Sequence, residues 1–445
     1  MALPPGPALP PVLQTLRWIA RPASTMVRCQ RRYGDCFTLR LVTAGDVVLV
    51  SDPAAIKQIF TGDPEVLRAG EANVVVEPVL GSRSILLLDG AEHLRERRLM
   101  LPAFRGERMQ AYADSIERIA EREFDRWPLG QPFRLHPRLT AITLEVILST
   151  VFGMEEGERR AELRRRVLRM IHRSRSRIGM LPVLRDDHGR YSPGGMFRAL
   201  VREIDEPLLA EIADRRAGRA GYGPGSDDVL SLLLQARDED GSPMSDATLR
   251  DELMTLLVAG HETTGTSLAW TFERLLRHPR ALAALEAEIE DGGEEYLDAV
   301  IRESLRLRPV LPIVARRCAA PYELLGHELP VGTIVSPCIF LTHRRADLYP
   351  EPEAFRPERF LGRAPDTYAW LPFGGGVRRC LGAGFALLEM RIVLRTILRR
   401  ASLRVPADPA GEPIVRGGIT LMPRRGSLVA LERRGPRSVA SAAQH

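Results

Sequence analysis

Hydrophobic and polar residues alternate with a helical period over most of the first two thirds of the chain. Apolar positions recur at three- and four-residue spacing from residue 53 to residue 307, a pattern typical of amphipathic helices packed on a core. Before them, residues 37–41 and 46–51 cluster apolar side chains on either side of Gly45, which predicts a strand hairpin. The last third mixes short strand patterns with loops. The fold class predicted is mainly α with small β-sheets (α+β).

The longest helical pattern begins near Ser245, a residue type that caps helix N-termini, and ends before Pro279. Its roughly 32 residues would span about 48 Å, enough to cross the whole molecule. Residues 1–12 form a proline-rich lead, and the small, polar residues 433–445 predict a disordered tail. The sequence shows neither repeats nor a linker, so we expect one domain over residues 1–445.

Composition and charge exclude some classes of function. The chain is 44% hydrophobic and 27% charged, as in an ordinary globular protein. Its net charge is +6, but the arginines alternate with acids and no nucleic-acid motif accompanies them, so we expect no nucleic-acid partner. A run of about 20 apolar residues is missing, so we expect no membrane anchor. Five scattered cysteines indicate a reducing, cytoplasmic setting with one functional thiol.

The densest chemical signal lies in residues 373–382, a glycine-rich, doubly basic loop that ends at Cys380 and precedes a long helical pattern. A thiol at a helix N-terminus faces unpaired N–H groups and the positive end of the helix dipole, which favour the thiolate. Three glycines let the backbone pass beneath a flat group, against which Phe373 can pack while Arg378 supplies charge. Such a group would be a haem. The alternative is a buried structural thiol.

This loop resembles the haem-binding loop of cytochromes P450, and the matching residues are Phe373, Gly374, Gly376, Arg378, Cys380 and Gly382. The resemblance implies the cytochrome P450 fold, in which a long central helix crosses the haem. It also implies that Cys380 is the axial ligand of the iron in haem b (iron protoporphyrin IX), where the sulfur donates electrons and favours O–O cleavage.

Midway along the long helix, residues 259–264 resemble the P450 motif that opens a groove over the haem. Ala259 and Gly260 would form the groove, Glu262 would relay protons from solvent, and Thr263 would hold dioxygen or a water. Gly260 costs about 1 kcal/mol inside a helix, and room for dioxygen would explain its presence. The open alternative is that the Thr263 hydroxyl bonds to its own helix.

The pair His261 and Glu262 also begins like the His-Glu-x-x-His helix of zinc proteases. The position of the second histidine is occupied by Gly265, so one of the two ligands that such a site needs is missing. We therefore set the metalloprotease interpretation aside.

Two further motifs support the resemblance. Glu303 and Arg306 lie at i, i+3 in a helical pattern and match the P450 Glu-x-x-Arg motif. Arg359 matches the arginine that completes a buried triad with that pair. In isolation such a pair would be an ordinary surface ion pair. The implied role of the triad is structural, because it locks the loop that presents Cys380.

Haem carries two propionates, which need cationic or hydrogen-bonding partners. The resemblance points to His93 and Arg97 at i, i+4 on a helix, to Arg316 on a strand, and to Arg378. Arg317 is an alternative to Arg316. Each arginine taken alone could be a solvated surface residue.

The resemblance implies that five segments surround a substrate, namely residues 74–88, 170–196 as a mobile lid, 256–259, 310–314 and 417–422. Their aliphatic content points to a hydrophobic small molecule such as a terpenoid, fatty acid, steroid or macrolide, although aliphatic residues line any core as well. The candidate wall residues are Val75, Val79, Leu80, Ile85, Leu257, Val310, Ile313, Ile419 and Leu421.

Together the motifs predict a soluble, bacterial-type P450 monooxygenase that uses O2, two electrons and two protons to hydroxylate or epoxidise such a molecule. The resemblance is greatest to P450s that oxidise lipids or terpenoids. The alternatives are a peroxide-dependent or rearranging P450-like enzyme and a non-catalytic haem-thiolate sensor. The acid–alcohol pair Glu262 and Thr263 argues against both.

About 65 residues follow Cys380, too few for a fused electron-transfer domain. We therefore expect a monomer served by a separate ferredoxin or flavodoxin with its reductase. A basic docking patch would speed encounter with an acidic partner. The resemblance implies which residues form this patch, because some arginines lie near motifs that surround the thiolate side in the family. They are Arg95, Arg98, Arg105, Arg379 and Arg391.

Overall fold

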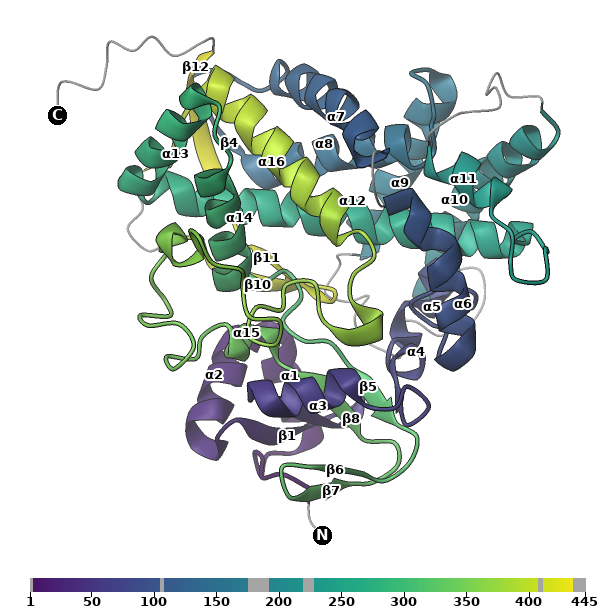
Figure 1. The fold of residues 1–445 in the computed structure, drawn as a ribbon, viewed down its shortest axis with the longest axis vertical. Helices are drawn as coiled ribbons and strands as arrows, with labels where there is room; N and C mark the ends of the chain where they lie inside the picture. The colour runs from purple at the N-terminus through teal and green to yellow at the C-terminus, as the bar shows by residue number, and fades with distance from the viewer. Residues whose placement is uncertain (1–2, 105–107, 175–191, 219–227, 407–410, 435–445) are drawn as a thin grey trace.

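A 31-residue helix, α12 (Asp246–Leu276), crosses the middle of the computed structural model (Figure 1). Ser245 begins the helix by accepting a hydrogen bond from the Thr248 backbone N–H, and the helix ends shortly before Pro279. The predicted long central helix is therefore confirmed. The structure describes residues 3–104, 108–174, 192–218, 228–406 and 411–434.

Helices make up most of the described chain. The earlier ones are α1 (Pro11–Ala20), α2 (Pro22–Tyr33), α3 (Pro53–Thr61), α4 (Ala69–Ala72), α5 (Glu77–Leu80), α6 (Gly90–Met100), α7 (Arg108–Phe124), α8 (Leu135–Thr150), α9 (Glu158–Ser174) and α10 (Pro193–Arg216). The later ones are α11 (Val229–Gln235), α13 (Pro279–Asp291), α14 (Glu295–Leu307), α15 (Ile339–Thr342) and α16 (Ala383–Arg400). Short 3-10 helices are η1 (Val74–Val76), η2 (Leu101–Phe104), η5 (Pro357–Phe360) and η6 (Gly376–Arg378). Within these described helices, none is both long enough and apolar enough to cross a membrane.

The described strands form small sheets, as the sequence predicts. The largest sheet has the order β1-β2-β8-β5-β3, and its β1–β2 hairpin is the predicted one, with Phe37 paired to Leu49. Its strands are β1 (Cys36–Leu41), β2 (Gly45–Val50), β3 (Leu67–Arg68), β5 (Arg316–Cys318) and β8 (Ile334–Pro337). The smaller sheets pair β4 (Pro132–Arg134) and β9 (Ala401–Arg404) with β12 (Leu428–Arg434), β6 (Tyr322–Leu324) with β7 (His327–Leu329), and β10 (Ile414–Gly417) with β11 (Thr420–Pro423). The predicted fold class is confirmed.

The strand β12 corrects the prediction of a disordered tail from residue 433. Arg433 and Arg434 belong to the strand, and Arg433 pairs with Ser402 of β9. Residues 435–445 lie outside the described residues. So do residues 175–191, which form most of the segment that the sequence suggests as a lid.

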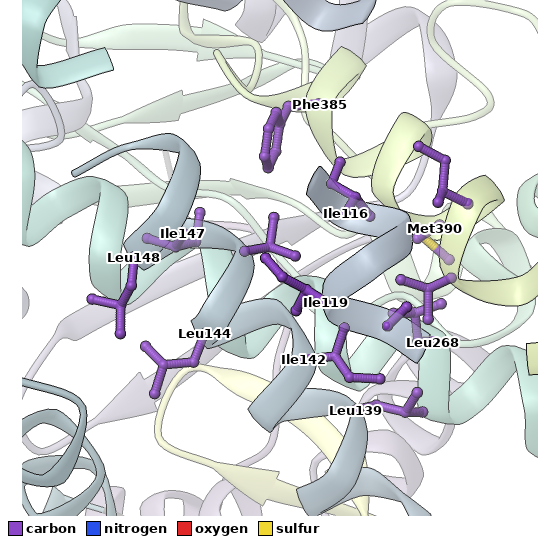
Figure 2. Close-up of a cluster of buried hydrophobic side chains, with 14 of the residues drawn as sticks. Ile116, Ile119, Leu139, Ile142, Leu144, Ile147, Leu148, Leu268, Phe385 and Met390 are labelled. Carbon is purple, nitrogen blue, oxygen red and sulfur yellow. The ribbon is translucent and has the colours of Figure 1, made fainter. Parts of the chain in front are cut away.

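The largest hydrophobic core lies where α7, α8, α12 and α16 meet. Figure 2 shows Ile119 of α7, Ile142 of α8, Leu268 of α12 and Met390 of α16 in this core, and all four side chains are at most 4% exposed. Each such buried side chain contributes about 1.5–3 kcal/mol to stability. This packing fixes α16, and therefore the loop before it, relative to the central helix.

Candidate active site

Cys380 ends a tight loop in front of α16. Its backbone N–H donates to the Phe373 carbonyl oxygen at 2.9 Å, with η6 between the two residues. Gly382 is the N-cap residue of α16, and its carbonyl oxygen accepts from the Ala386 N–H at 2.9 Å. The loop therefore holds an accessible Cys380 side chain just before the start of the helix.

Two of the three loop glycines make room for α3. A Cβ on Gly376 would lie 2.2 Å from the Phe60 carbonyl oxygen, and one on Gly375 would lie 2.5 Å from the Phe60 ring. Gly376 also has a φ of +64°, which side chains disfavour. Packing against Phe60 therefore gives these two glycines a reason within the protein, and passage beneath a flat group stays a prediction. Gly382 is more open, because a Cβ there would meet no atom within 4 Å.

The protein groups around Cys380 do not by themselves favour its thiolate. Burial raises the pKa of the Cys380 thiol, although the Gly382 N–H and the charges of Arg97 and Arg379 lower it. Protein surrounds the thiol on most sides, while one side reaches accessible surface. The expectation of an anion made by the helix terminus is therefore wrong for the protein alone. A coordinating metal deprotonates a thiol outright, so a haem iron would supply the missing stabilisation.

The predicted propionate partners lie together. His93 and Arg97 come from α6, Arg316 from β5 and Arg378 from η6. Burial, with the positive charges of the three arginines, lowers the pKa of His93 to about 3. Burial and the charge of Arg378 likewise lower the pKa of Arg316 to about 10. The three arginines gather positive charge here, and Asp89 pairs with one of them, Arg378, at 2.6 Å. A further anion would be stabilised by the charges that gather at this place, so these residues fit the two propionates of a haem.

Between the two neighbouring strand arginines, Arg316 is the one that faces this cluster. Arg316 is 8% exposed, and its guanidinium lies 5.8 Å from the centroid of the Phe60 ring. Successive side chains of a strand point to opposite faces. Arg317 accordingly points away and donates to the Gly332 carbonyl oxygen at 3.0 Å. This geometry favours Arg316 as the propionate partner.

One turn near the middle of α12 is accessible, although residues 251–255 and 264–273 on either side are buried. Ala259 is exposed, and Gly260, Glu262 and Thr263 are half-buried. The Thr263 hydroxyl donates to the Ala259 carbonyl oxygen at 2.6 Å. The hydrogen bond to its own helix, which the sequence left as an alternative, is therefore present. The Thr263 oxygen still has a lone pair with which to accept from another donor.

Gly260 is explained by helix packing. A Cβ at this position would lie 2.8 Å from the Ile147 Cδ1 atom of α8. Room for Ile147 is thus a packing reason for this glycine, and the room for dioxygen expected from the sequence stays a prediction. The neighbouring His261 is fully buried, and its Nδ1–H donates to the Leu257 carbonyl oxygen at 2.5 Å. It therefore belongs to the packing of the helix.

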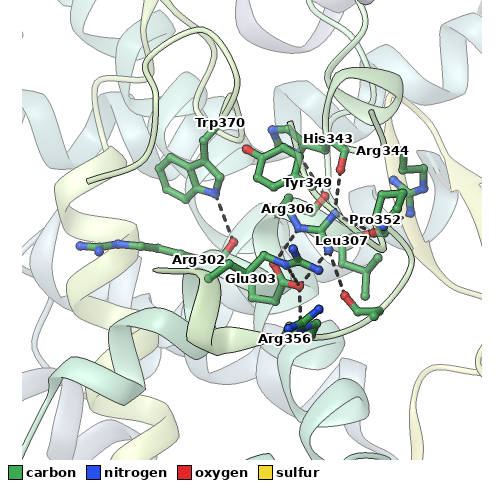
Figure 3. A network of polar contacts seen from close by, with 12 residues as sticks. Arg302, Glu303, Arg306, Leu307, His343, Arg344, Tyr349, Pro352, Arg356 and Trp370 are labelled. Carbon is green, nitrogen blue, oxygen red and sulfur yellow. Dashed lines mark hydrogen bonds and ion pairs between the residues drawn. The ribbon is translucent and has the colours of Figure 1, made fainter. Parts of the chain in front are cut away.

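Glu303, Arg306 and Arg359 form one ionic network, part of which Figure 3 shows. Arg306 donates to the Glu303 carboxylate at 2.6 and 2.8 Å, and Arg359 donates to the same carboxylate at 3.1 Å. Arg306 also donates to the carbonyl oxygens of His343 and Pro352 at 2.7 and 2.8 Å. Glu303 and Arg306 are both 0% exposed. The pair is therefore buried and bridges α14 to later loops.

His343, which no sequence pattern indicates, connects this network to the Cys380 loop. Its Nε2 accepts from the Leu371 backbone N–H at 2.8 Å, so the proton of the neutral ring is on Nδ1, which donates to the Arg306 carbonyl oxygen at 3.0 Å. Burial and the charge of Arg306 lower the pKa of His343 to about 3, which keeps the ring neutral. Leu371 then accepts from the Gly374 N–H at 3.0 Å. His343 can be identified from its long-range contacts in the structure, because the sequence around it carries no signal for this role.

The predicted substrate-wall residues separate by burial. The interior ones, all at most 7% exposed, are Leu80, Ile85, Leu257, Val310 and Leu421. The accessible ones are Val75, Val79, Ile313 and Ile419. The prediction is corrected for Leu257 and Leu421, because both belong to hydrophobic cores and have almost no accessible surface. Aliphatic composition alone cannot separate a core from a pocket wall.

The predicted basic docking patch is smaller than its arginine count suggests. Three of its members, Arg95, Arg98 and Arg391, form ion pairs with Asp238, Glu239 and Asp298 respectively. Arg105 lies outside the described residues. Arg379, next to Cys380, is exposed and pairs with no acid in the described part of the chain. Among the patch residues that the structure describes, Arg379 is the one whose charge stays available.

Comparisons with known proteins agree with this arrangement. The family model described as Cytochrome P450 matches residues 4–430. The chain is 42% identical to cytochrome P450 135B1 of Mycobacterium tuberculosis over all of this chain and 94% of that protein. It is 41% identical to cytochrome P450 138 of the same species over 97% of each.

Solved structures show the same fold. Retinoic acid-bound cyanobacterial CYP120A1 has a TM-score of 0.84 and 26% identity, covering 97% of this chain and all of the other. The cytochrome P450DA heme domain has a TM-score of 0.83 and 25% identity, covering 99% of this chain and all of the other. With a family match over nearly its whole length, the chain belongs to the cytochrome P450 family and is a haem-thiolate monooxygenase.

Proposed function

We propose that the protein uses a haem b ligated by Cys380 to insert one oxygen atom from O2 into a hydrophobic small molecule. The observation that carries the proposal is the cluster of His93, Arg97, Arg316 and Arg378 near the Cys380 loop. Burial, followed by the charges of neighbouring arginines, lowers the pKa values of His93, Arg316 and Arg378. The two propionates of a haem supply the matching anions. When bound, the haem supplies the iron at which O2 is activated, with the thiolate favouring O–O cleavage.

The accessible turn of α12 supplies protons in this proposal. Glu262 is half-buried and can exchange protons with solvent. The Thr263 hydroxyl donates a hydrogen bond to the Ala259 carbonyl oxygen. Its oxygen can accept a second hydrogen bond, from a water that receives a proton from Glu262. A peroxide-dependent or rearranging enzyme would not need this acid and alcohol, and neither would a non-catalytic sensor. The pair therefore favours O2-dependent monooxygenation.

The substrate class follows from the accessible aliphatic residues. Val75 and Ile419 are 45% and 51% exposed, and Val79 and Ile313 are half-buried. Apolar wall residues with few polar groups suit a ligand that is itself largely apolar. The structural relative CYP120A1 was solved with retinoic acid, an apolar chain that ends in a carboxylate. We infer that terpenoids and fatty acids are the substrates to try first, before steroids and macrolides.

In this proposal the protein works in the cytoplasm as a single-domain monomer and receives electrons from a separate ferredoxin or flavodoxin with its reductase. Arg379 would meet the acidic partner, because it is exposed beside the Cys380 loop and has no acidic partner among the described residues. An exposed charge at this place raises the rate of association with the partner more than it raises the affinity of the complex.

A spectral screen tests the substrate class. The haem-loaded protein is mixed with retinoic acid, fatty acids, steroids and macrolides, and loss of the iron-bound water is followed by the spin-state shift. We expect a saturable shift with a terpenoid or fatty acid. Turnover of that compound under labelled O2, with a surrogate ferredoxin, should place one labelled oxygen in the product. A product formed with peroxide but not with O2 and electrons would contradict the proposal.

A further inference from the structure

The segment between α5 and α6 is attached to the central helix by its backbone. We call residues 81–89 the strap; α5 and α6 lie beside one end of α12 (Figure 1). The Arg83 backbone N–H donates to the Asp251 carboxylate at 2.9 Å, and the Ile85 N–H donates to the Glu252 carboxylate at 2.7 Å. Both acids belong to the first turns of α12.

A hydroxyl pair adds a third contact between the strap and α12. The Ser84 and Thr255 hydroxyl oxygens are 2.7 Å apart, and Thr255 donates its proton to the Asp251 carbonyl oxygen at 2.7 Å. Ser84 must therefore donate to Thr255. Ser84 and Thr255 are 0% and 4% exposed, so solvent does not compete with this contact.

The other side of the strap holds Arg378. The guanidinium donates to the carbonyl oxygens of Ile85 at 3.1 Å and of Leu88, and it pairs with Asp89 at 2.6 Å. Within the described residues, every hydrogen bond of this side chain goes to the strap. Ile85 links Glu252 to Arg378, because its N–H donates to Glu252 and its carbonyl oxygen accepts from Arg378.

Glu252 is an ionisable residue at a fully buried position. It is 0% exposed, and its second carboxyl oxygen, Oε2, has no hydrogen-bond partner in the described part of the chain. Burial raises the pKa of Glu252 well above its ordinary value, and the nearby carboxyl groups of Glu96 on α6 and Asp251 on α12 add to this shift. A neutral carboxyl group still accepts the Ile85 N–H through its carbonyl oxygen.

We propose that Glu252 is a positioning residue for the propionate site, because it fixes Ile85 and so holds the carbonyl oxygens that orient Arg378. The contact with Arg378 rests on geometry, whereas the consequence for haem rests on the proposed function. Losing the Glu252 acceptor would leave the Ile85 N–H buried and unpaired. The strap would then open locally, and Arg378 would lose its support.

Amide hydrogen exchange of the full-length, haem-loaded protein tests this directly. In Glu252→Leu we expect exchange in peptides covering residues 83–88 to rise about tenfold, whereas Glu252→Gln, which keeps an acceptor oxygen, should stay within about twofold of the wild type. The matched control is Glu412→Leu, because Glu412 is also a buried acid that accepts a backbone N–H, from Arg425. Glu412→Leu should leave the amide exchange of residues 83–88 unchanged. Thr255→Val removes the Ser84 contact and the hydrogen bond of the Thr255 hydroxyl to its own helix, and it leaves Glu252 in place. It should raise the exchange of residues 83–88 about threefold and serves if Glu252→Leu does not fold.

The proposal is overturned if Glu252→Leu and Thr255→Val leave the strap protected, if Glu252→Gln opens it equally, or if exchange rises evenly over the whole chain.

A second readout is haem transfer to apomyoglobin, which we expect to be several-fold faster in Glu252→Leu and unchanged in Glu252→Gln. An opened strap with unchanged haem transfer would overturn the positioning role. A wild-type protein that binds no haem would instead defeat the proposed function, and the exchange measurement would still report on the strap.

Discussion

The Nε2 atom of His343 accepts a hydrogen bond from the backbone N–H of Leu371 at 2.8 Å. Through its other nitrogen, His343 also donates to the Arg306 carbonyl oxygen at 3.0 Å. One buried imidazole therefore joins the Glu303–Arg306 pair of α14 to the segment that leads into the Cys380 loop. The loop that presents the thiol is held by this ring as well as by its own turn.

Replacing this histidine should destabilise the protein. His343→Leu leaves the Leu371 N–H and the Arg306 carbonyl oxygen buried and unpaired, each at a cost of about 1–3 kcal/mol. We expect the free energy of unfolding in urea to fall by about 2–6 kcal/mol in total. His327→Leu, a change at a half-buried position in β7, is the control and should cost less than about 1 kcal/mol. Equal losses in the two variants would contradict the role of His343.

The same imidazole should make stability depend on pH. The pKa of His343 is about 3 in the folded protein, against about 6.5 in an unfolded chain. Between these values the unfolded chain binds a proton that the folded protein does not, so stability is full above about pH 6.5 and falls as the pH decreases toward 3. We expect His343→Gln to reduce the slope of unfolding free energy against pH in this window by up to about 1.4 kcal/mol per pH unit. An unchanged slope would show that the ring is charged or exposed.

Breaking the buried ion pair should cost more than breaking a surface pair. Glu303→Ala leaves Arg306 charged and 0% exposed, and we expect a loss of about 3–5 kcal/mol in unfolding free energy. The control is Glu294→Ala, because Glu294 pairs with Arg395 at 2.7 Å but is 52% exposed. It should cost less than about 1 kcal/mol. If both variants lose equally little, the Glu303 network does not support the fold.

The Thr263 hydroxyl should matter for chemistry and little for folding. Thr263→Ala removes a hydroxyl that bonds only to its own helix in the described structure, so stability should change by less than about 0.5 kcal/mol. With a substrate from the spectral screen, we expect several-fold more peroxide released per product, with haem binding unchanged. Thr263→Ser, which keeps the hydroxyl, should stay near the wild type. Unchanged coupling in Thr263→Ala would leave Thr263 as a helix residue without a part in proton delivery.

Local signals in the sequence predicted much of this molecule. The helix α12 could be placed because Ser245 and Pro279 mark its ends within the sequence itself. The loop at Cys380 and the pair Glu303 and Arg306 could be found because their residues are close together in the chain. The same locality explains why Arg306 could not be recognised as buried: its partners His343 and Pro352 come from distant segments.

The failures came from contacts across the fold. Gly260 and Gly376 were interpreted from the cofactor side alone, but a Cβ at either position would also meet Ile147 or Phe60. The thiolate was expected from the helix terminus, but burial outweighs that effect on the pKa of Cys380. In each case the deciding neighbour lies far away in the chain, and a one-dimensional pattern does not reveal it.

The central claim, that Cys380 ligates a haem iron, is tested most directly by the absorption spectrum of the reduced, CO-treated protein. The account predicts the strongly red-shifted Soret band of a thiolate-ligated haem. Cys380→Ser should lose this band, whereas Cys36→Ser, at another partly accessible cysteine, should keep it. A Soret band at the ordinary position of a histidine-ligated haem in the wild type, or a red-shifted band that survives in Cys380→Ser, would contradict the account.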